Sequence, residues 1–354
     1  MGMKQQMTSA SQKRIPARYF VLLLNALRAQ GVDATRLLSA AGIDETAFNR
    51  RDNTLSMTEV NAFVRVAHEL TGRDDLGFEL GRLVKMNSHD LLGYGLLSCH
   101  TPHEAMCMAS RHQHLMLETF ALHYQRRPGS PGEATYTPTI AMPEATLRFQ
   151  LEALAIALQN QVRLMLGADV PAFDIYLSMP EPAHVQRYRA LAPIRFHFCE
   201  NALPGVRVVM GAELLDRPLP MGNAQVVQQV DEQCSLLGRR PATGHFGWGE
   251  YVEMVLRAAE GEQVTLEDLA RRLNVSARTI DRHLKSEDLA FRDLSDKVRF
   301  ERACELLRTP GVTIKQVALK LGFSDTGNFR RAFRRVVGVT PTEYLNSNGQ
   351  PFAA

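Results

Sequence analysis

The sequence contains few cysteines and no long apolar run. Its five cysteines, in 354 residues, are odd in number and lack the spacing of a disulfide framework, which favours a reducing compartment, the cytoplasm, over secretion. No stretch approaches the roughly 18 to 20 consecutive apolar residues of a membrane-spanning helix, and the polar start of the chain lacks the apolar segment of a signal peptide. We therefore expect neither export nor a membrane anchor.

Motifs of known catalytic chemistry are also missing. The sequence has no G-x-S-x-G, no phosphate-binding loop and no H-E-x-x-H motif. The glycine-rich stretch at 244–249 follows no predicted strand, so a linker is a better interpretation than a nucleotide-binding loop. We expect no enzyme activity and no bound cofactor.

The small positive net charge of the chain, +3, is concentrated near its end. Residues 261–350 hold 16 Lys and Arg against 12 Asp and Glu, a balance of +4, and the other residues hold 25 against 26, a balance of −1. A local basic excess favours a polyanionic partner.

Length and residue patterns predict two domains of different class. After a disordered tail over 1–13, helical spacing, strand-like segments and a long amphipathic helix over 144–166 indicate a mixed α/β sensor domain over 14–235. The strand-like segments on either side of the turn-rich PGSPG at 128–132 predict a hairpin or a loop between strands. A linker rich in Gly and Pro follows at 236–246. Every segment of 247–348 then has helical periodicity, which predicts an all-α domain.

The all-α segment contains one sequence unit twice. VTLEDLARRLNVS at 264–276 and VTIKQVALKLGFS at 312–324 lie 48 residues apart and share five of thirteen residues. Most other positions exchange like for like. Such a repeat indicates one structural unit used twice.

Each copy has the signals of a helix, a tight turn and a second helix. Thr265 with Asp268, and Thr313 with Gln316, form capping boxes that begin the first helix. A small alanine inside that helix permits close approach of a neighbour, and the serine that ends each copy is suited to cap the second helix. The sequence therefore predicts two helix-turn-helix units.

The second helices, predicted at 276–287 and 324–336, carry clustered basic residues. Phe329 and Phe333 stand four apart and face the core, so the arginines between and after them turn outward. The outward positions are Arg330, Arg331, Arg334 and Arg335 in the second copy and Arg278, Asp281, Arg282 and Lys285 in the first. Guanidinium groups bind guanine edges and phosphates. A solvated helix face is the alternative, but its repetition behind two capped helices favours DNA binding.

Between the copies, apolar spacing predicts a helix over 293–308 that ends at Thr309, Pro310 and Gly311. A helix of about sixteen residues is about 24 Å long. It can hold the two second helices about one DNA turn, roughly 34 Å, apart on one face of the duplex.

These features resemble the AraC/XylS family of bacterial transcription regulators over about 247–345. The closing signature of that family is a Gly-Phe pair, a Phe-x-x-x-Phe recognition helix, and then Gly, Pro and Tyr. Its members here are Gly322, Phe323, Phe329, Phe333, Gly338, Pro341 and Tyr344. The resemblance implies sequence-specific binding to double-stranded promoter or operator DNA, with RNA polymerase as a further partner.

The resemblance also implies which side chains face the bases. These positions are Arg278, Asp281 and Arg282 in the first unit and Thr326, Gly327, Asn328 and Arg331 in the second. Gly327 has no side chain, so one contact of the family pattern is missing. Asp281 is acidic where many relatives are neutral or basic, and it can either accept from a cytosine amino group or pair with Arg278 or Lys285.

The N-terminal domain carries a second resemblance. LGYGLLSCHTPHEAM at 92–106 and AELLDRPLP at 212–220 are similar to the N-terminal domain of AraC-like regulators that is labelled arabinose-binding. This implies a small-molecule effector of unnamed identity and a homodimer, and it supplies no ligand residues.

A cluster of Cys and His residues gives a competing hypothesis, a metal- or redox-responsive regulator. Its members are Cys99, His100, His103, Cys107, His112 and His114. A helix that starts at Thr101 and Pro102 puts His103 and Cys107 on one face, but His114 lies about 10.5 Å further along its axis, too far to share an ion. We therefore expect no metal site.

Two further interpretations concern the same domain. Met106, Met108 and Met116 lie on the predicted helix of the Cys/His cluster, and their spacing favours core packing over a cofactor site. A DNA-repair or architectural protein, with unrecognised chemistry in its N-terminal domain, stays open beside the regulator.

Overall fold

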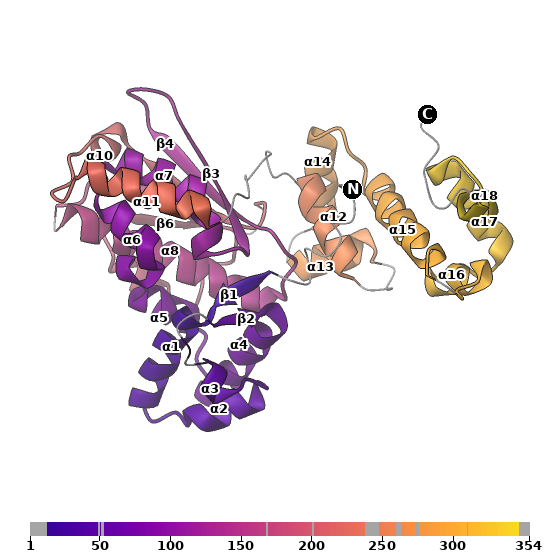
Figure 1. Cartoon of the computed structure of the whole chain (residues 1–354), viewed down its shortest axis with the longest axis horizontal. Coiled ribbons are helices and arrows are strands. Elements are labelled where there is room, and N and C mark those ends of the chain that lie inside the picture. Colours follow the sequence, from indigo (N-terminus) through magenta and orange to yellow (C-terminus); the bar gives the residue numbers. More distant parts are fainter. Residues whose placement is uncertain are drawn as a thin grey trace. The chain divides into compact units, whose positions relative to one another are not determined.

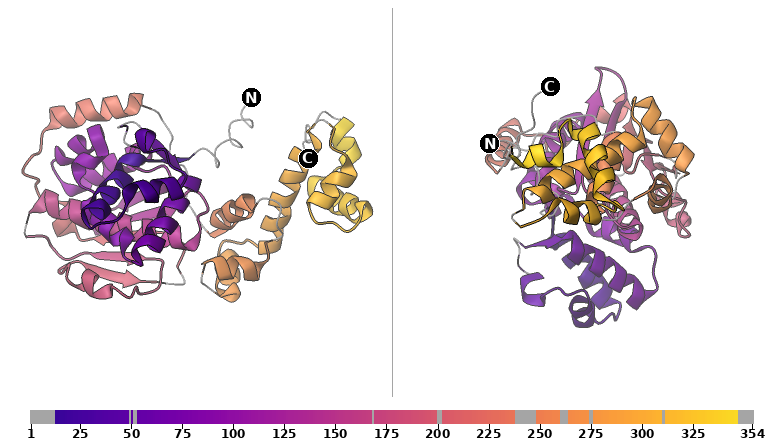
Figure 2. Two further views of the ribbon diagram at one scale, coloured as in Figure 1. Left: turned by 90° about the horizontal axis from the view of Figure 1, so that it is seen from below. Right: turned by 90° about the vertical axis from the view of Figure 1, so that its right-hand side faces the viewer.

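The structure is a computed structural model that describes residues 13–48, 50, 53–167, 169–199, 202–237, 248–259, 264–273, 276–309 and 311–346 (Figures 1 and 2). The chain forms two compact units, 1–245 and 246–354. The first is mixed α/β and the second is helical, as predicted. Apart from Lys13, Leu236 and Leu237, the predicted tail and linker lie outside the described residues.

The first unit begins with a group of helices that has its own apolar core. These helices are α1 (Ala17–Ala29), α2 (Ala34–Ala40), α3 (Glu45–Phe48), α4 (Met57–Thr71) and α5 (Leu76–Leu83). Two short antiparallel strands, β1 (Arg14–Pro16) and β2 (Thr54–Ser56), accompany them. The sequence pattern did not predict these strands, because three residues are too few to show alternation.

A five-stranded sheet forms the other half of this unit. Its strands are β3 (Phe120–Arg126), β4 (Gly132–Pro138), β5 (Asp174–Leu177), β6 (Arg195–Phe198) and β7 (Val206–Met210), in the order β3-β4-β7-β5-β6. Only the β5/β6 pair is parallel. The turn-rich PGSPG segment joins β3 to β4, which confirms the hairpin predicted from its flanking strand-like runs.

The long helix α8 (Glu144–Leu166) lies between the sheet and the helical group, and its predicted bounds are confirmed. One side contacts β5 and β7 and the other contacts α4 and α5. A Cβ atom at Gly77 of α5 would lie 2.4 Å from the Phe149 carbonyl, and one at Gly81 would lie 2.6 Å from the Ile156 Cβ. Glycine at these two positions therefore lets α5 approach α8 closely.

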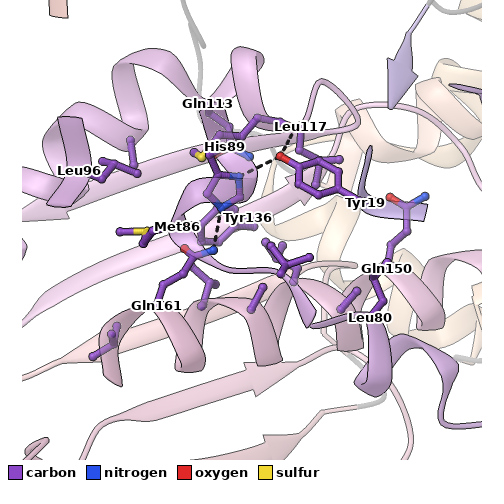
Figure 3. A pocket seen from close by; sticks show the side chains of 18 of the residues that line it. Tyr19, Leu80, Met86, His89, Leu96, Gln113, Leu117, Tyr136, Gln150 and Gln161 are labelled. Atoms are coloured by element: carbon purple, nitrogen blue, oxygen red, sulfur yellow. Dashed lines mark hydrogen bonds between the residues drawn. The ribbon is translucent and has the colours of Figure 1, made fainter. Parts of the chain in front are cut away.

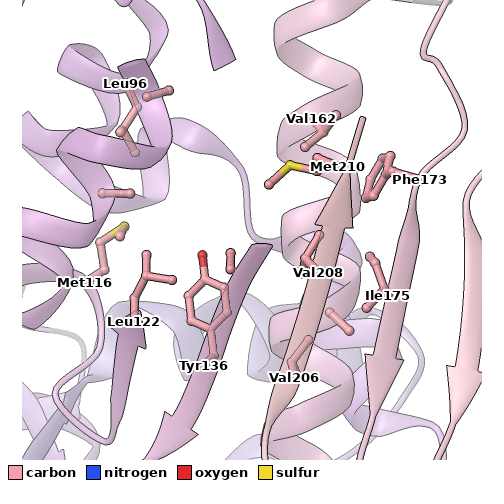
Figure 4. Packing of buried hydrophobic residues seen from close by; sticks show 14 of the residues in the cluster. Leu96, Met116, Leu122, Tyr136, Val162, Phe173, Ile175, Val206, Val208 and Met210 are labelled. Carbon is pink, nitrogen blue, oxygen red and sulfur yellow. The ribbon is translucent and has the colours of Figure 1, made fainter. Parts of the chain in front are cut away.

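The remaining elements cover one side of the sheet and the ends of α8 (Figure 1). They are the 3₁₀ helix η2 (Met86–His89) and the helices α6 (Asp90–Leu97), α7 (Pro102–Met116), α9 (Val185–Arg189), α10 (Ala212–Leu215) and α11 (Ala224–Leu236). The main apolar core lies between this cover and the sheet (Figure 4).

The second unit is built from seven helices in the part of the chain that the structure describes. They are α12 (Trp248–Ala258), α13 (Leu266–Leu273), α14 (Ala277–Ser286), α15 (Phe291–Leu307), α16 (Ile314–Lys320), α17 (Thr326–Val337) and α18 (Pro341–Asn346). The pairs α13/α14 and α16/α17 are the two repeated units, and α15 joins them. The predicted connecting helix and both predicted second helices agree with the structure to within two residues.

The caps of these helices differ in one place from the prediction. Both predicted capping boxes are present, and the Ser276 hydroxyl accepts from the Thr279 amide at 3.0 Å. The prediction that Ser324 caps α17 is wrong. Asp325 does so instead, accepting from the Asn328 amide at 2.7 Å, because the second copy has one extra residue between its turn and its second helix.

The core of the second repeat is aromatic. Phe300 of α15 lies 6.4 Å from Phe329 and 5.9 Å from Phe333, measured between ring centroids, and Tyr344 of α18 packs on Phe333 at 5.8 Å. Phe329 and Phe333 are fully buried, as predicted. The Phe300 ring thus holds α15 against α17, a contact that was not predicted.

The caps give a first prediction. Ser276→Ala should destabilise the second unit by about 1 kcal/mol, since it removes a partner from a helix-terminal amide, and Asp325→Ala should cost a similar amount. Ser324→Ala is the matched control and should change the free energy of unfolding by less than about 0.5 kcal/mol. Trp248 is the only tryptophan of the chain and lies in this unit, so urea unfolding followed by its fluorescence measures the effect. Equal losses for the two serines would contradict the assigned caps.

Candidate functional site

The basic residues of α17 lie on its exposed side. All four arginines are exposed: Arg330, Arg331, Arg334 and Arg335. Arg335 donates to Asp296 of α15 at 2.9 Å and so ties α17 to the connecting helix. Hydrogen bonds from Thr340 lower the pKa of Glu343, and the positive charge of Arg334 lowers it further. The outward orientation predicted for these arginines agrees with the structure.

The first turn of α17 holds a row of hydrogen-bonded polar side chains. Asp325 accepts from the side-chain amide of Asn328, and the Arg331 guanidinium donates to Asn328 Oδ1 at 2.6 Å. The structure thus brings together Asn328 and Arg331, two of the residues predicted to face bases, and leaves Thr326 half-buried beside them. The role of Asp325 was not predicted, although an acidic residue just before a helix is a recognisable cap signal.

The corresponding helix of the first repeat, α14, is less strongly basic than α17. Arg278, Arg282 and Lys285 are exposed, and Lys285 donates to the Asp281 carboxylate at 2.7 Å. Of the two roles open to Asp281, the ion pair with Lys285 is therefore present in the free protein. This pair offsets one positive charge on the exposed side of α14.

Two contacts position the helices of the second unit. The Trp248 ring stacks on the His283 ring of α14 at 4.8 Å, and the Glu287 carboxylate accepts from the Trp248 and Gly249 amides at 2.7 and 2.9 Å. Since Trp248 begins α12, this contact holds the start of the unit against α14.

Arg299 of α15 holds the turn of the second repeat. Its guanidinium donates two hydrogen bonds to the Leu321 carbonyl, at 3.1 and 2.5 Å, and lies 4.1 Å from the centroid of the Phe323 ring. Burial lowers the pKa of Arg299. A guanidinium can satisfy the last carbonyl of a helix and stack on an aromatic ring with the same group. Neither this contact nor the Trp248 contact was predicted.

The Cys/His cluster does not come together as one site. His103 Nδ1 lies 2.8 Å from the Tyr124 hydroxyl, whereas His112 Nε2 lies 2.8 Å from Asp231 of α11. Burial raises the pKa of the Cys99 thiol to about 12 and also raises that of Cys107. In the described ranges, no group of three His, Cys, Asp or Glu side chains is placed to hold a metal ion.

The first unit contains a cavity of about 130 Å³ enclosed mainly by α1, α7 and α8 (Figure 3). Its wall is apolar over most of its extent and includes Leu80 of α5, Leu96 of α6, and Met106 and Met116 of α7. Met108 packs in the main core, and Met106 and Met116 contact that core as well as the cavity. The predicted core role of these methionines is confirmed, and Met106 and Met116 also line the cavity.

One wall of the cavity carries a row of polar groups. Gln161 Nε2 lies 2.7 Å from His89 Nε2, His89 Nδ1 lies 2.9 Å from the Tyr19 hydroxyl, and that hydroxyl donates to the Met116 carbonyl at 3.3 Å (Figure 3). An amide NH₂ group can only donate, so His89 Nε2 accepts and the single ring proton lies on Nδ1. Burial, with the nearby charge of Arg18, lowers the pKa of His89 to about 4. His89 is therefore neutral.

Arg18 braces the segment that carries His89. Its guanidinium donates to the Ser88 carbonyl at 2.8 Å and pairs with the Asp90 carboxylate at 2.8 Å. Asp90 itself has a positive φ of 49°, which is uncommon outside glycine. The bend after His89 is thus held in place by an ion pair from α1, and the imidazole stays directed at the cavity wall.

Comparison with known proteins agrees with both parts of this geometry. Residues 31–219 match the family described as "Arabinose-binding domain of AraC transcription regulator, N-term", and residues 269–347 match a helix-turn-helix domain family. The chain belongs to the AraC family of transcription regulators. It is a DNA-binding regulator with an N-terminal ligand-binding domain, and not an enzyme.

The relatives of this AraC-family chain include regulators that match over their full length. It is 29% identical to the ornithine utilization regulator of Pseudomonas aeruginosa over 97% of this chain and 99% of that protein. It is 25% identical to an uncharacterized HTH-type transcriptional regulator of Mycobacterium tuberculosis over 94% of this chain and 97% of that protein.

Among solved structures, the regulator CdpR of Pseudomonas aeruginosa matches with 22% identity and a TM-score of 0.41, over 88% of this chain and 96% of that chain. In the described part of this regulator, no helix has the length and apolarity needed to cross a bilayer.

His89 gives a prediction about pH. A histidine whose pKa is about 4 when folded and about 6.5 when unfolded takes up a proton more readily in the unfolded chain. Stability from this group is therefore complete above pH 6.5 and is lost as the pH falls towards 4. Between pH 7.5 and pH 5 the loss should be about 2 kcal/mol.

The matched variant is His89→Gln, which does not titrate and can keep both hydrogen bonds. Between pH 7.5 and pH 5 the free energy of unfolding of this variant should fall by about 2 kcal/mol less than that of the wild type. Urea unfolding followed by far-UV circular dichroism at the two pH values measures the difference. An unchanged pH dependence would show that His89 titrates normally in the folded protein.

Proposed function

We propose that this protein is a ligand-controlled regulator in which a small effector binds the cavity of the first unit and alters DNA binding by the second. In this proposal α14 and α17 read two successive major-groove segments of an operator. The observation that carries the proposal is the repeated unit with its exposed basic side chains, in one chain with a separate unit that encloses an apolar cavity lined by a few polar groups.

The residues proposed to contact DNA are divided by role. Thr326, Asn328 and Arg331 at the start of α17, and Arg278, Asp281 and Arg282 on α14, are proposed base contacts. Arg330, Arg334, Arg335 and Lys285 are proposed phosphate contacts. The Arg331–Asn328 hydrogen bond supports this division, because it places a donor fork beside an amide at the helix end that enters the groove. Arg335 must give up or share its contact with Asp296 to reach a phosphate.

A homodimer and contact with RNA polymerase belong to the proposal through the family resemblance. A cytoplasmic location belongs to it through the few cysteines without a disulfide spacing. A second DNA-binding domain supplied by a dimer would raise the affinity for a paired operator through effective concentration alone.

The metal- or redox-sensor alternative finds little in the geometry to support it. Its His103 and His112 side chains bond to separate partners, and among the described residues no three His, Cys, Asp or Glu side chains are placed to hold a metal ion. Burial raises the pKa of the Cys99 and Cys107 thiols, which disfavours the thiolate that oxidation needs. The Pseudomonas relative is named for ornithine utilization. Ornithine is a poor candidate for this cavity, because its charged groups would meet no Lys, Arg, Asp or Glu among the described residues that line it.

The division of roles on α17 can be tested with two variants. Arg331→Ala should weaken binding to the cognate site by about 1 to 3 kcal/mol and relax preference at one base pair, since it removes a forked donor from a base edge. Arg334→Ala should weaken all sequences alike and reduce the salt dependence by about one phosphate. Both side chains are exposed, so folding should be little affected.

The measurement is binding to an operator selected from random oligonucleotides and then varied one base pair at a time, at two salt concentrations. Lys315→Ala, an exposed basic residue of α16 outside the proposed set, is the control. An Arg331→Ala protein with unaltered base preference would remove Arg331 from the base-reading set.

The cavity can be tested by filling it. Ala109 of α7 lines the cavity, and Ala109→Leu should abolish binding of compounds that stabilise the wild-type protein in a thermal-shift screen. A compound at 100 times its Kd adds about 2.7 kcal/mol to the stability of the wild type, so the loss is readily seen. The control is Ala40→Leu at an exposed position of α2. If a compound still binds Ala109→Leu and still changes operator affinity, the effector lies elsewhere.

A further inference from the structure

The lining of the cavity restricts the charge of any ligand. Among the described residues that line it there is no Lys, Arg, Asp or Glu. The groups that could titrate are Tyr19, His89 and Tyr136, and burial lowers the pKa of His89 to about 4 and raises those of both tyrosines. All three are therefore neutral at pH 7. A charged ligand group would lose its hydration and meet no opposite charge, which costs several kcal/mol.

The Tyr136 hydroxyl is a polar group that the protein itself leaves unused. Tyr136 lies on β4 with an exposed fraction of only 3%, and its hydroxyl points from the strand into the space between the helices and the sheet (Figure 4). Burial raises the pKa of Tyr136. The hydroxyl is not among the fully buried atoms without a partner, and Tyr136 lines the cavity, so a ligand in the cavity can reach this hydroxyl and supply a hydrogen bond.

Two glutamine side chains of the cavity wall also have an amide atom without a hydrogen-bond partner among the described residues. Gln113 Oε1 of α7 and Gln150 Nε2 of α8 are buried and have no hydrogen-bond partner in the described chain. Rotation about the last side-chain torsion of a glutamine is soft, so either amide can turn to a nearby ligand atom. The other polar groups of the wall, Tyr19, His89 and Gln161, already bond to one another.

The size of the cavity restricts the ligand further. Its volume is about 130 Å³. An engineered apolar cavity of about 150 Å³ in another protein takes up benzene. The available space thus suits a single six-membered ring with a short substituent, or a short aliphatic chain.

We propose that the ligand of this cavity is a small, uncharged and mainly apolar molecule with one carbonyl or hydroxyl oxygen, which pairs with the Tyr136 hydroxyl. This inference rests on the proposed function, since it names the class of effector that the cavity accepts. The apolar body fills the space beside Leu96, Met106 and Met116. The oxygen completes the hydrogen bonding of Tyr136 and recovers part of what its burial costs.

Three probes of similar size test the proposal by isothermal titration calorimetry on the full chain. Acetophenone has a ring and one carbonyl, ethylbenzene has no polar atom, and benzoate carries a negative charge at pH 7.5. Acetophenone should bind most tightly, ethylbenzene about 10-fold more weakly because it leaves Tyr136 without a partner, and benzoate more than 10-fold more weakly than acetophenone.

Tyr136→Phe removes the hydroxyl and keeps the ring, so it tests the hydrogen bond with little change in the shape of the cavity. The variant should bind acetophenone about 10-fold more weakly and ethylbenzene as well as the wild type does. Its melting temperature without ligand should be unchanged or higher, because an unpaired hydroxyl is removed. The matched control is Tyr124→Phe on the neighbouring strand β3, whose hydroxyl bonds to His103 outside the cavity. It should lower the melting temperature and leave the binding of both probes unchanged.

Several results would overturn the proposal: tighter binding of benzoate than of acetophenone, no binding of either neutral probe at millimolar concentration, or equal acetophenone affinity in the wild type and Tyr136→Phe. Operator affinity measured with and without saturating acetophenone keeps the two proposals apart. If acetophenone binds as expected and operator affinity never responds to any cavity ligand, the effector role fails while the ligand class stands. If a charged compound changes operator affinity and loses its effect in Ala109→Leu, the effector role stands and the ligand class is wrong.

Discussion

The close crossing of α5 and α8 is the constraint on which the first unit depends. Gly77 and Gly81 allow α5 to lie against α8 near Phe149 and Ile156, and the opposite side of α8 contacts β5 and β7. A single helix thereby belongs to both apolar cores of the unit, the helical one and the one beneath the sheet. A larger side chain at either glycine would separate the two cores, because the nearest atom at Gly77 is the backbone carbonyl oxygen of Phe149, which cannot move aside as a flexible side-chain end can.

The cavity is a consequence of the same arrangement. It lies where α8 passes from one core to the other, and its polar wall is assembled from α1, η2 and α8. Arg18 holds the bend that carries His89, and His89 in turn orients Tyr19 and Gln161. A rigid polar wall facing an apolar space suits recognition of a ligand that is apolar over most of its surface.

The second unit uses a different principle, the repetition of one capped helix pair. The two copies are not equivalent. The second has an aromatic centre at Phe300, a guanidinium clamp from Arg299 and four exposed arginines. The first pairs its acidic Asp281 with Lys285, and Trp248 packs on the C-terminal half of its second helix. The second copy is thus the more strongly basic of the two, and the contacts of the first with Trp248 hold the start of α12 against α14.

The sequence by itself determined the features that depend on neighbouring residues. The capping boxes at Thr265 and Thr313, the bounds of α8, the β3/β4 hairpin and the outward side of α17 all follow from patterns within a few positions, and the repeat with its closing signature identified the family. Even here one inserted residue moved a cap from Ser324 to Asp325. Only the tertiary structure decided the cavity and the clamps, because Tyr19, His89, Tyr136 and Gln161, like Arg299 and Leu321, are distant in the chain and become neighbours only when the helices and strands pack. No local pattern marks such residues, since each on its own is an ordinary core or surface side chain.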